Sequence, residues 1–305
     1  MQKWASLRIQ VRTFPSANSK GAHVPQPILP IAFKNRLLAS LPPAVVAELS
    51  PHMLPVVLHR NQTLAEPHQR VDAAYFLEDG LCSIVATMEN GMSVEVGLIG
   101  RDGVVGMPVV LGTISSPNRY FMQIPGFGLR VKANILSDLV DEHPELRRCL
   151  QRSVHGLLIQ TAQTAACNRL HELHERLARW LLMCSDMVES NNILITQEFL
   201  ATMLGTLRSS VTVAAATIQK EGLITIARGR VTIHNHAGLE DATCECYKVV
   251  HNEYIRLGLL NTGPLELPAT RLLSLRSPRL TDHQSPIPIS FLKVRQAKDA
   301  SETSP

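Results

Sequence analysis

The sequence lacks the long apolar runs that a membrane-spanning chain needs. In its 305 residues no uncharged apolar stretch approaches the roughly 18 residues that cross a bilayer, and no hydrophobic signal core with a small-residue cleavage site is found near the start. Cysteine is sparse: six cysteines are spread from Cys82 to Cys246. Secreted proteins that depend on disulfides contain many more cysteines for their length. We therefore expect a soluble, cytoplasmic protein with no membrane partner.

Motifs of common enzymes are missing as well. The chain has no phosphate-cradling glycine loop with a lysine, no nucleophile elbow and no HExxH helix. The nearest approach is HELHE, in which His171 and His174 lie three apart on one helical face, but the surrounding apolar rhythm favours exposed or hinge residues over metal ligands. These absences predict that the protein is not an enzyme and has no catalytic residue, cofactor or metal site.

Acidic residues are absent from the segment before Leu41, which is rich in basic residues and proline. This composition predicts a flexible extension over residues 1–34, with an organelle-targeting segment or a misassigned start as alternatives. Repeated prolines predict a flexible tail over 261–305, whose basic residues would add nonspecific attraction to phosphate.

A compact signature is present in residues 195–233, ITQEFLATMLGTLRSSVTVAAATIQKEGLITIARGRVTI. Gly205 separates two helical periods, since glycine readily enters the left-handed conformation that ends a helix. Ala201 falls where the two helices approach most closely, and Val211 and Ala214 supply the inner face of the second helix. A strand pair with Arg-Gly-Arg at its tip follows. The order predicts a winged helix-turn-helix, within a domain over 171–238; an ordinary helical hairpin is the alternative.

The start of the second helix and the wing tip form the candidate DNA-binding surface. Arg208 is the first candidate, because an arginine there can bind guanine O6 and N7 through two hydrogen bonds, or else a phosphate. The serines are expected to position the helix more than to discriminate bases, and the wing arginines to neutralise phosphate unless that turn is simply solvated. The predicted set is Thr206, Arg208, Ser209, Ser210, Thr212, Arg228 and Arg230.

The net charge of +4 is only mildly basic, so a local patch and not a global field must attract DNA. The length leaves room for about two domains.

Residues 54–131 consist of short apolar runs broken by glycine- and acid-containing turns. This texture is typical of an antiparallel barrel or jelly roll and predicts a β-roll sensor domain over 35–143.

Pro144 opens a long helical stretch, because proline is tolerated in the first turn of a helix. One stripe along it, with intervals of three, four or seven residues, contains Leu146, Leu150, Leu157, Thr161 and Thr164. Such a mixed apolar and small polar seam suits a two-stranded coiled coil, so residues 144–170 are predicted to be a dimerisation helix. Burial of the helix on its own β domain is the alternative.

The order of β-roll, long helix and winged helix-turn-helix resembles the transcription regulators of the cyclic-AMP receptor protein and Fnr family. The resemblance covers about residues 35–236 and is strongest in ITQEFLATMLGTLRSSVTVAAATIQKEGLI. It implies an α+β fold with a cyclic-nucleotide-binding-like β-roll, and a homodimer whose recognition helices enter successive major grooves of an operator. RNA polymerase and a small-molecule effector of unknown identity are further implied partners. A helix-turn-helix that serves protein contacts is the alternative.

The effector site departs from the family pattern. Cyclic-AMP-binding members grip the ribose with a Gly-Glu pair and the phosphate with an Arg-Ser pair; here Met107 follows Gly106, and Tyr120 follows Arg119. Thr161 matches the long-helix threonine that faces the base. The resemblance thus implies an effector pocket at these five residues that is degenerate for cyclic AMP. The closely spaced amino-terminal cysteines of Fnr-type members are absent.

The DNA sequence that this protein recognises should also differ from that of the cyclic-AMP receptor protein. Of the receptor protein's Arg-Glu-x-x-x-Arg base-reading set only Arg208 is matched, while Ser209 and Val213 take the other two places. Each lost contact removes about 1–3 kcal/mol of discrimination, so a different operator is expected.

Cys244 and Cys246 form the remaining motif, CECY. Spaced by two, they point to opposite sides of a strand or nearly opposite sides of a helix, so they chelate poorly unless two further ligands approach. The histidines nearby in sequence are His234, His236 and His251. Packing of a terminal helix, within residues 239–260, explains the segment without a metal.

Overall fold

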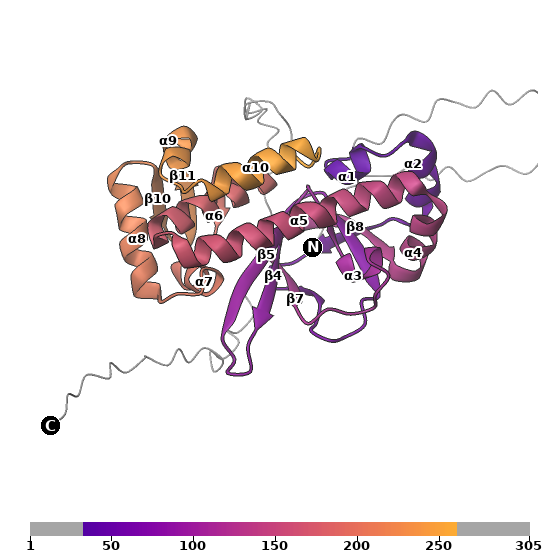
Figure 1. Cartoon of the computed structure of the whole chain (residues 1–305), viewed down its shortest axis with the longest axis horizontal. Coiled ribbons are helices and arrows are strands. Elements are labelled where there is room, and N and C mark those ends of the chain that lie inside the picture. Colours follow the sequence, from indigo (N-terminus) through magenta and orange to yellow (C-terminus); the bar gives the residue numbers. More distant parts are fainter. Residues whose placement is uncertain (1–32, 261–305) are drawn as a thin grey trace, which may run out of the picture. The chain divides into compact units, whose positions relative to one another are not determined.

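The structure, a computed structural model, describes residues 33–260 (Figure 1). The predicted tail over 261–305 and the predicted extension over 1–34, apart from Phe33 and Lys34, lie outside the described residues. Antiparallel strands dominate the first half of the described chain, and helices with a small sheet dominate the second. This mixture confirms the predicted α+β fold class.

The β-roll consists of short strands that alternate with turns. Its strands within the described residues are β1 (Leu54–Leu58), β2 (Thr63–Ala65), β3 (Ala73–Leu77), β4 (Leu81–Thr87), β5 (Ser93–Ile99), β6 (Val104–Val105), β7 (Arg119–Ile124) and β8 (Gly126–Lys132). They pair in two sheets with the orders β1-β8-β3-β6 and β2-β7-β4-β5. Phe76, Leu77 and Met122 have no exposed surface, so the apolar runs form the core that their spacing predicts.

Short helices flank the roll. They are α1 (Arg36–Ala39), α2 (Pro43–Leu49), the 3-10 helix η1 (Ser50–His52), α3 (Met107–Val110) and α4 (Ala133–Glu142). Asn35 caps α1 by accepting from the amide of Leu38, and its own amide donates to the carbonyls of Leu77 and Gly103 at 3.1 and 3.0 Å. A buried cap residue thereby fastens α1 to the roll.

The long helix α5 (Pro144–Leu170) is present as predicted, but its predicted seam faces inward. Leu146 and Leu150 have no exposed surface and belong to the chain's own core. Leu157 lies against Gly97 of β5, where an added Cβ would meet its Cδ1 at 2.8 Å. The prediction of a dimer seam is wrong for Leu146 and Leu150, because they are already buried within one chain, and Leu157 is half-buried against β5.

The two threonines of that stripe also bind within the chain. Thr161 Oγ1 donates to the carbonyl of Val96 at 3.0 Å, and Thr164 accepts from Arg179. A stripe that packs on a sheet has the same period as one that packs on a partner helix, so the sequence pattern alone could not separate the two cases.

α5 closes the open edge of the second sheet. β5 is the last strand of β2-β7-β4-β5, so one row of its backbone groups has no strand partner there. Gln160, 1% exposed, accepts from the amide of Leu98 at 2.6 Å and donates to its carbonyl at 3.3 Å. The side-chain amide of Gln160 also donates to Tyr254 Oη of α10 (Cys246–Arg256) at 2.9 Å. One side chain therefore joins α5, β5 and α10.

A helical head with a small sheet follows α5. It contains α6 (Leu173–Val188), β9 (Asn192–Leu194), α7 (Gln197–Met203), α8 (Arg208–Lys220), β10 (Ile224–Ala227) and β11 (Arg230–Ile233). Thr196 caps α7 by accepting from the amide of Phe199, and Gly205 has a φ of +62° in the turn. Ala201, Val211 and Ala214 are buried, which confirms their predicted inner positions.

The bend between α7 and α8 is 106°, within the range of helix-turn-helix units. No single helix among residues 33–260 is long and apolar enough to cross a membrane; only this bent pair taken together meets that criterion.

The carboxy-terminal part of the described chain is not one helix. The predicted terminal helix over 239–260 is divided into α9 (His236–Asp241) and α10. The intervening turn contains Cys244, and α10 packs along α5 and α6.

Candidate DNA-binding surface

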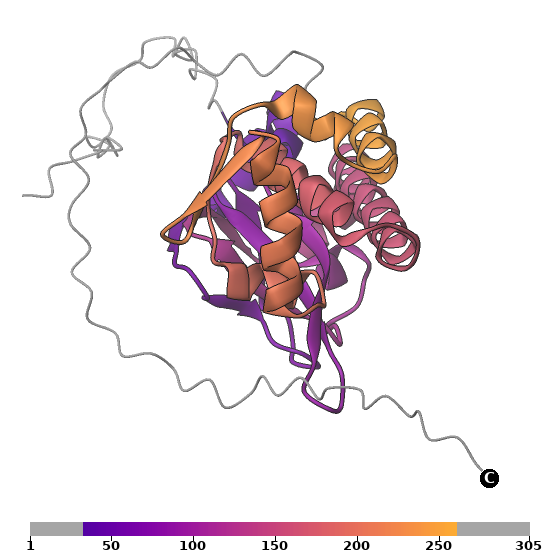
Figure 2. The same ribbon diagram turned by 90° about the vertical axis from the view of Figure 1, so that its left-hand side faces the viewer.

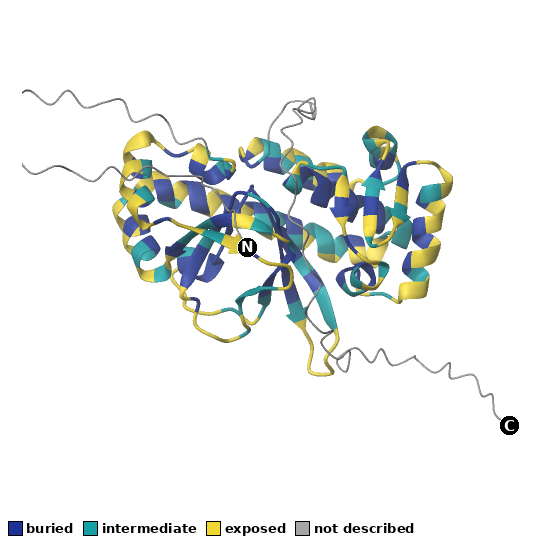
Figure 3. Ribbon diagram, turned by 180° about the vertical axis from the view of Figure 1, so that it is seen from behind, coloured by how far each residue is buried: buried dark blue, intermediate teal, exposed yellow. Residues whose placement is uncertain are grey.

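The recognition helix α8 has one buried and one exposed face. Val211, Ala215 and Ile218 lie in the core, where α8 packs on α6 and α7. The opposite face is open to solvent along its length, as Figures 2 and 3 show. The helix is therefore held from behind and free to enter a groove.

The predicted residues of α8 divide into two groups. Arg208, Ser209 and Thr212 are exposed, whereas Ser210 is half-buried. Thr206 is half-buried in the turn, where its amide donates to the carbonyl of Ala201 at 2.9 Å. Of the predicted residues in and before α8, Arg208, Ser209 and Thr212 are therefore the most accessible to DNA bases.

Arg208 has only a loose partner within the chain. Its Nη1 lies 3.7 Å from Glu198 Oε2, and both side chains are more than half exposed. An exposed ion pair of this kind contributes little, so the guanidinium can leave Glu198 for a stronger anion at small cost.

Val213 was not among the predicted DNA-binding residues, yet it lies on the exposed face of α8 with 70% of its surface open. The sequence showed it only as a replacement for an arginine of the receptor protein. The signal that could have found it is helical spacing, because Ser209 and Val213 are one turn apart on the outer face.

The wing is a tight hairpin between β10 and β11, to which β9 adds a third strand. Arg228 and Gly229 both have left-handed backbones, with φ of +48° and +73°. Two successive residues of this kind make the turn that fits the twist of a two-residue hairpin. Arg228 and Arg230 are exposed at its tip, and the hairpin lies beside α8 (Figure 2).

The predicted effector residues are engaged within the chain. Met107 is 5% exposed in the core, so an apolar side chain stands where the family pattern has a carboxylate. Gly106 lies against Ala74 of the first sheet, and an added Cβ would meet that residue at 3.0 Å. Arg119 Nη2 donates to Thr63 Oγ1 at 2.8 Å, and Tyr120 is 5% exposed. An effector pocket at these residues stays a prediction.

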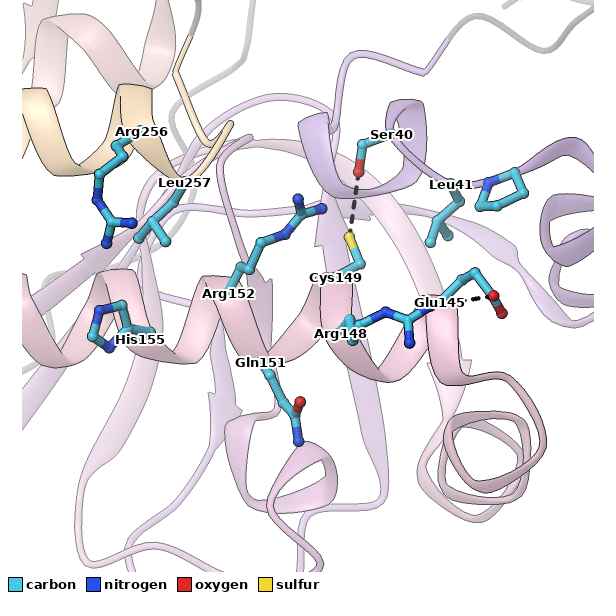
Figure 4. A pocket seen from close by; sticks show the side chains of 11 residues that line it. Ser40, Leu41, Glu145, Arg148, Cys149, Gln151, Arg152, His155, Arg256 and Leu257 are labelled. Carbon is cyan, nitrogen blue, oxygen red and sulfur yellow. Dashed lines mark hydrogen bonds and ion pairs between the residues drawn. The ribbon is translucent and has the colours of Figure 1, made fainter.

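A groove is found on a different part of the molecule. It has a volume of about 640 Å³ and lies between α1, α5 and α10 (Figure 4). Arg152 and His155 of α5 and Arg256 of α10 line it, so most of its charged side chains are basic. None of the five predicted effector residues lines it.

A buried acid connects the roll to the head. Trp180 Nε1 of α6 donates to Glu95 Oε1 of β5 at 2.6 Å. Burial raises the pKa of the Glu95 carboxyl to about 8, although hydrogen bonds from Trp180 and Ser83 and the charge of Arg179 oppose the rise. The carboxyl is therefore largely protonated near neutral pH, which reduces the cost of burying it.

An ion-pair network makes a second connection. Arg101, 8% exposed, pairs with Glu189 at 2.6 Å and with Asp79 at 3.2 Å. Arg36 pairs with the other oxygen of Glu189 at 2.8 Å. Because Glu189 is the residue that ends α6, two arginines of the roll hold the end of the first helix of the head.

The helix-turn-helix itself contacts the roll. A Cβ added at Gly205 would meet Val94 Cγ2 of β5 at 3.1 Å, and Phe199 packs edge-on against Phe121 of β7 with ring centroids 6.1 Å apart. Strand β5 therefore supplies contacts to α5, to α6 and to the turn between α7 and α8.

A β-roll, a long helix and a winged helix-turn-helix in this order define a class of DNA-binding transcription regulators with a cyclic-nucleotide-binding-like domain. The family model of the Crp-like helix-turn-helix domain matches residues 175–242. A global nitrogen regulator from Synechocystis sp. is 22% identical over 209 residues, or 64% of this chain and 92% of the relative. Another global nitrogen regulator, from Nostoc sp., is 23% identical over 193 residues, which are 59% of this chain and 86% of the relative.

Solved structures agree in fold. A transcriptional regulator of the Crp/Fnr family from Eubacterium rectale has a TM-score of 0.54 at 16% identity, covering 68% of this chain and 98% of its own. FixK2 from Bradyrhizobium japonicum has a TM-score of 0.55 at 13% identity, and the match covers 63% of this chain and 98% of FixK2. Residues 175–242 therefore form a Crp-like helix-turn-helix domain, and the chain is similar to transcription regulators of the Crp/Fnr family over about two thirds of its length.

We predict that Glu95→Gln changes the pH dependence of stability. The pKa of Glu95 is raised from 4.5 to about 8 on folding, so its contribution to stability is lost as pH rises between these values. Glutamine keeps an acceptor for Trp180 without a charge. From pH 6 to 8.5 the free energy of unfolding of the wild type should fall relative to the variant, by at most about 1.4 kcal/mol per pH unit.

Chemical denaturation across that pH range measures the effect. Glu89→Gln, at an exposed position in the β4–β5 turn, controls for the loss of an acidic side chain. Parallel curves for wild type and Glu95→Gln would show that the carboxyl does not titrate in this range.

Proposed function

We propose that the protein regulates transcription as a homodimer, with α8 of each chain in a major groove of DNA and the wing on the adjacent backbone. The observation that carries this proposal is the exposed face of α8, which presents Arg208, Ser209 and Val213 while its inner face is locked in the core. The proposal places the protein with its target DNA, in the cytoplasm that the sequence predicts. RNA polymerase and a small-molecule effector stay as predicted partners.

Base reading would combine one polar and one apolar contact. Arg208 is in the first turn of α8, where recognition helices meet base edges, and its guanidinium can bind guanine at two points. Val213, one turn after Ser209, offers methyl groups that suit the methyl of thymine. Arg228 and Arg230 at the wing tip supply phosphate contacts that carry no sequence information.

The dimer seam would lie on the outer face of α5. Six exposed or outward residues follow one another at intervals of four, three, four, three and four: Gln151, His155, Leu158, Ala162, Ala165 and Arg169. Alternating intervals of this kind are the heptad pattern of a two-stranded coiled coil. Leu158 leaves 64% of its surface exposed in one chain, and the alanines below it would let two helices approach closely.

We predict that Arg208→Ala weakens specific DNA binding. The loss of a bidentate guanine contact should cost about 1–3 kcal/mol, or about 5- to 150-fold in Kd at fixed salt. The measurement is fluorescence anisotropy on a duplex selected by the wild-type protein from a random library.

Arg70→Ala is the matched control, because Arg70 is an exposed arginine of the roll that pairs with Asp72. It should bind the selected duplex as the wild type does. Equal affinities for wild type and Arg208→Ala would remove Arg208 from the reading surface, and equal losses in both variants would reduce its role to general charge.

We predict that Leu158→Glu separates the dimer. Two facing glutamates in an apolar seam would repel each other and lose the contacts of the leucines. Sedimentation velocity should then show mainly monomer at concentrations where the wild type is a dimer, with an unchanged far-ultraviolet spectrum.

Leu111→Glu is its control, since Leu111 is 59% exposed and follows α3 instead of lying on α5. If Leu158→Glu sediments as the wild-type dimer does, the outer face of α5 is not the seam.

A further inference from the structure

A cluster of three cysteines and a histidine lies where α5 ends and α10 begins. Cys167 is in the last turn of α5, and His171 follows the helix directly. Cys244 and Cys246 come from the turn before α10 and its first residue. The three sulfurs and one imidazole nitrogen all lie within 4.8 Å of one another.

The cysteines are removed from solvent and from the main core. Their exposures are 1% for Cys167, 4% for Cys244 and 1% for Cys246, and they form a small buried cluster of their own. Neither the proposed DNA surface nor the proposed dimer seam uses these side chains.

The separations of the ligand atoms fit a single tetrahedral ion. The sulfurs of Cys167 and Cys244 are 3.6 Å apart, and the sulfur of Cys246 is 3.4 Å from His171 Nδ1. Zinc–sulfur bonds of about 2.3 Å at tetrahedral angles place ligand atoms about 3.7 Å from one another. A ligand cage of nearly the right size is therefore already formed.

The surrounding groups also match those of a metal site. His171 presents Nδ1 to the cluster, and its Nε2 lies 3.3 Å from Glu245 Oε2. A carboxylate on the far nitrogen fixes the tautomer and orientation of a metal-binding histidine. Gln163 Nε2 donates to the sulfur of Cys246 at 3.1 Å, which would stabilise a thiolate.

We propose that Cys167, His171, Cys244 and Cys246 form a structural zinc site. Three thiolates and one imidazole are a closed ligand set for zinc, with no position left for substrate. Calcium and magnesium require oxygen ligands. A cubane iron–sulfur cluster would spread its ligands more widely, because each one binds a different iron.

The site would tie three parts of the chain together. The ion would join the end of the long helix, the junction between α5 and α6, and the start of α10. Since α6 is the first helix of the head, the ion would hold the direction in which the head leaves α5. Zinc loading would therefore stabilise the head against α5, and its loss would free α10 at its start.

This proposal departs from the sequence-based expectation that the chain has no metal site. The sequence showed Cys244 and Cys246 as a poor pair and offered three histidines near them. In the structure His236 and His251 face Asp186 instead, at 3.5 and 3.3 Å, and His234 contacts Thr225. The missing ligands come from the end of α5.

The test begins with the metal content of the untagged full-length protein, purified with a reductant and measured by mass spectrometry. One zinc per chain is expected. After chelation, titration with Co²⁺ should produce a thiolate-to-cobalt charge-transfer band in the near ultraviolet. Cys149→Ser, at a buried cysteine outside the cluster, is the control and should keep both the zinc and the band.

Variants of the cluster give three distinct results. Cys246→Ser should lose the zinc and the band. His171→Cys, which offers four thiolates, should keep the zinc and strengthen the band, a gain that misfolding cannot produce. Glu245→Gln should weaken zinc affinity by about tenfold, as expected for a group that orients a ligand.

Three outcomes would overturn the proposal. The first is a wild-type protein that neither contains zinc nor gives the cobalt band. The second is iron in place of zinc. The third is a Cys167–Cys244 disulfide in protein isolated without a reductant, because two sulfurs joined in a disulfide cannot bind zinc as thiolates.

Discussion

The amide side chain of Gln160 determines how the long helix lies on the roll. An edge strand presents backbone donors and acceptors that must be paired or covered, and Gln160 pairs both groups of Leu98 while Thr161 pairs the carbonyl of Val96. These bonds set the rotation of α5 about its axis. Once that rotation is set, Leu146 and Leu150 must enter the core, and Leu158 must face outward.

Strand β5 contacts the long helix α5, the first helix of the head and the helix-turn-helix. The Glu95 carboxyl accepts from Trp180, Val94 contacts Gly205 of the helix-turn-helix, and the backbone of β5 is hydrogen-bonded to α5. A ligand that displaced β5 would have to stretch or break at least one of these contacts. The roll and the helix-turn-helix are therefore joined by contiguous packing, which extends from β5 to the turn before α8.

Local features of the chain were predictable from sequence, and long-range juxtapositions were not. The turn at Gly205 and the inner residues Ala201, Val211 and Ala214 follow from helix geometry, so the helix-turn-helix was found correctly. The length of α5 was found too, but not its orientation, because burial on a sheet and burial on a partner helix require the same period. The cluster of three cysteines and a histidine could not be found, since no local pattern brings Cys167 and His171 to Cys244 and Cys246.

The turn at the tip of the wing shows that this region is not optimised for folding alone. Arg228 holds a left-handed backbone that a side chain with a Cβ adopts at a cost on the order of 1 kcal/mol, whereas glycine would adopt it freely. The free protein carries that strain in an exposed loop, where packing does not compensate for it. Replacing Arg228 with glycine would remove this cost, but it would also remove one of the two arginines at the wing tip.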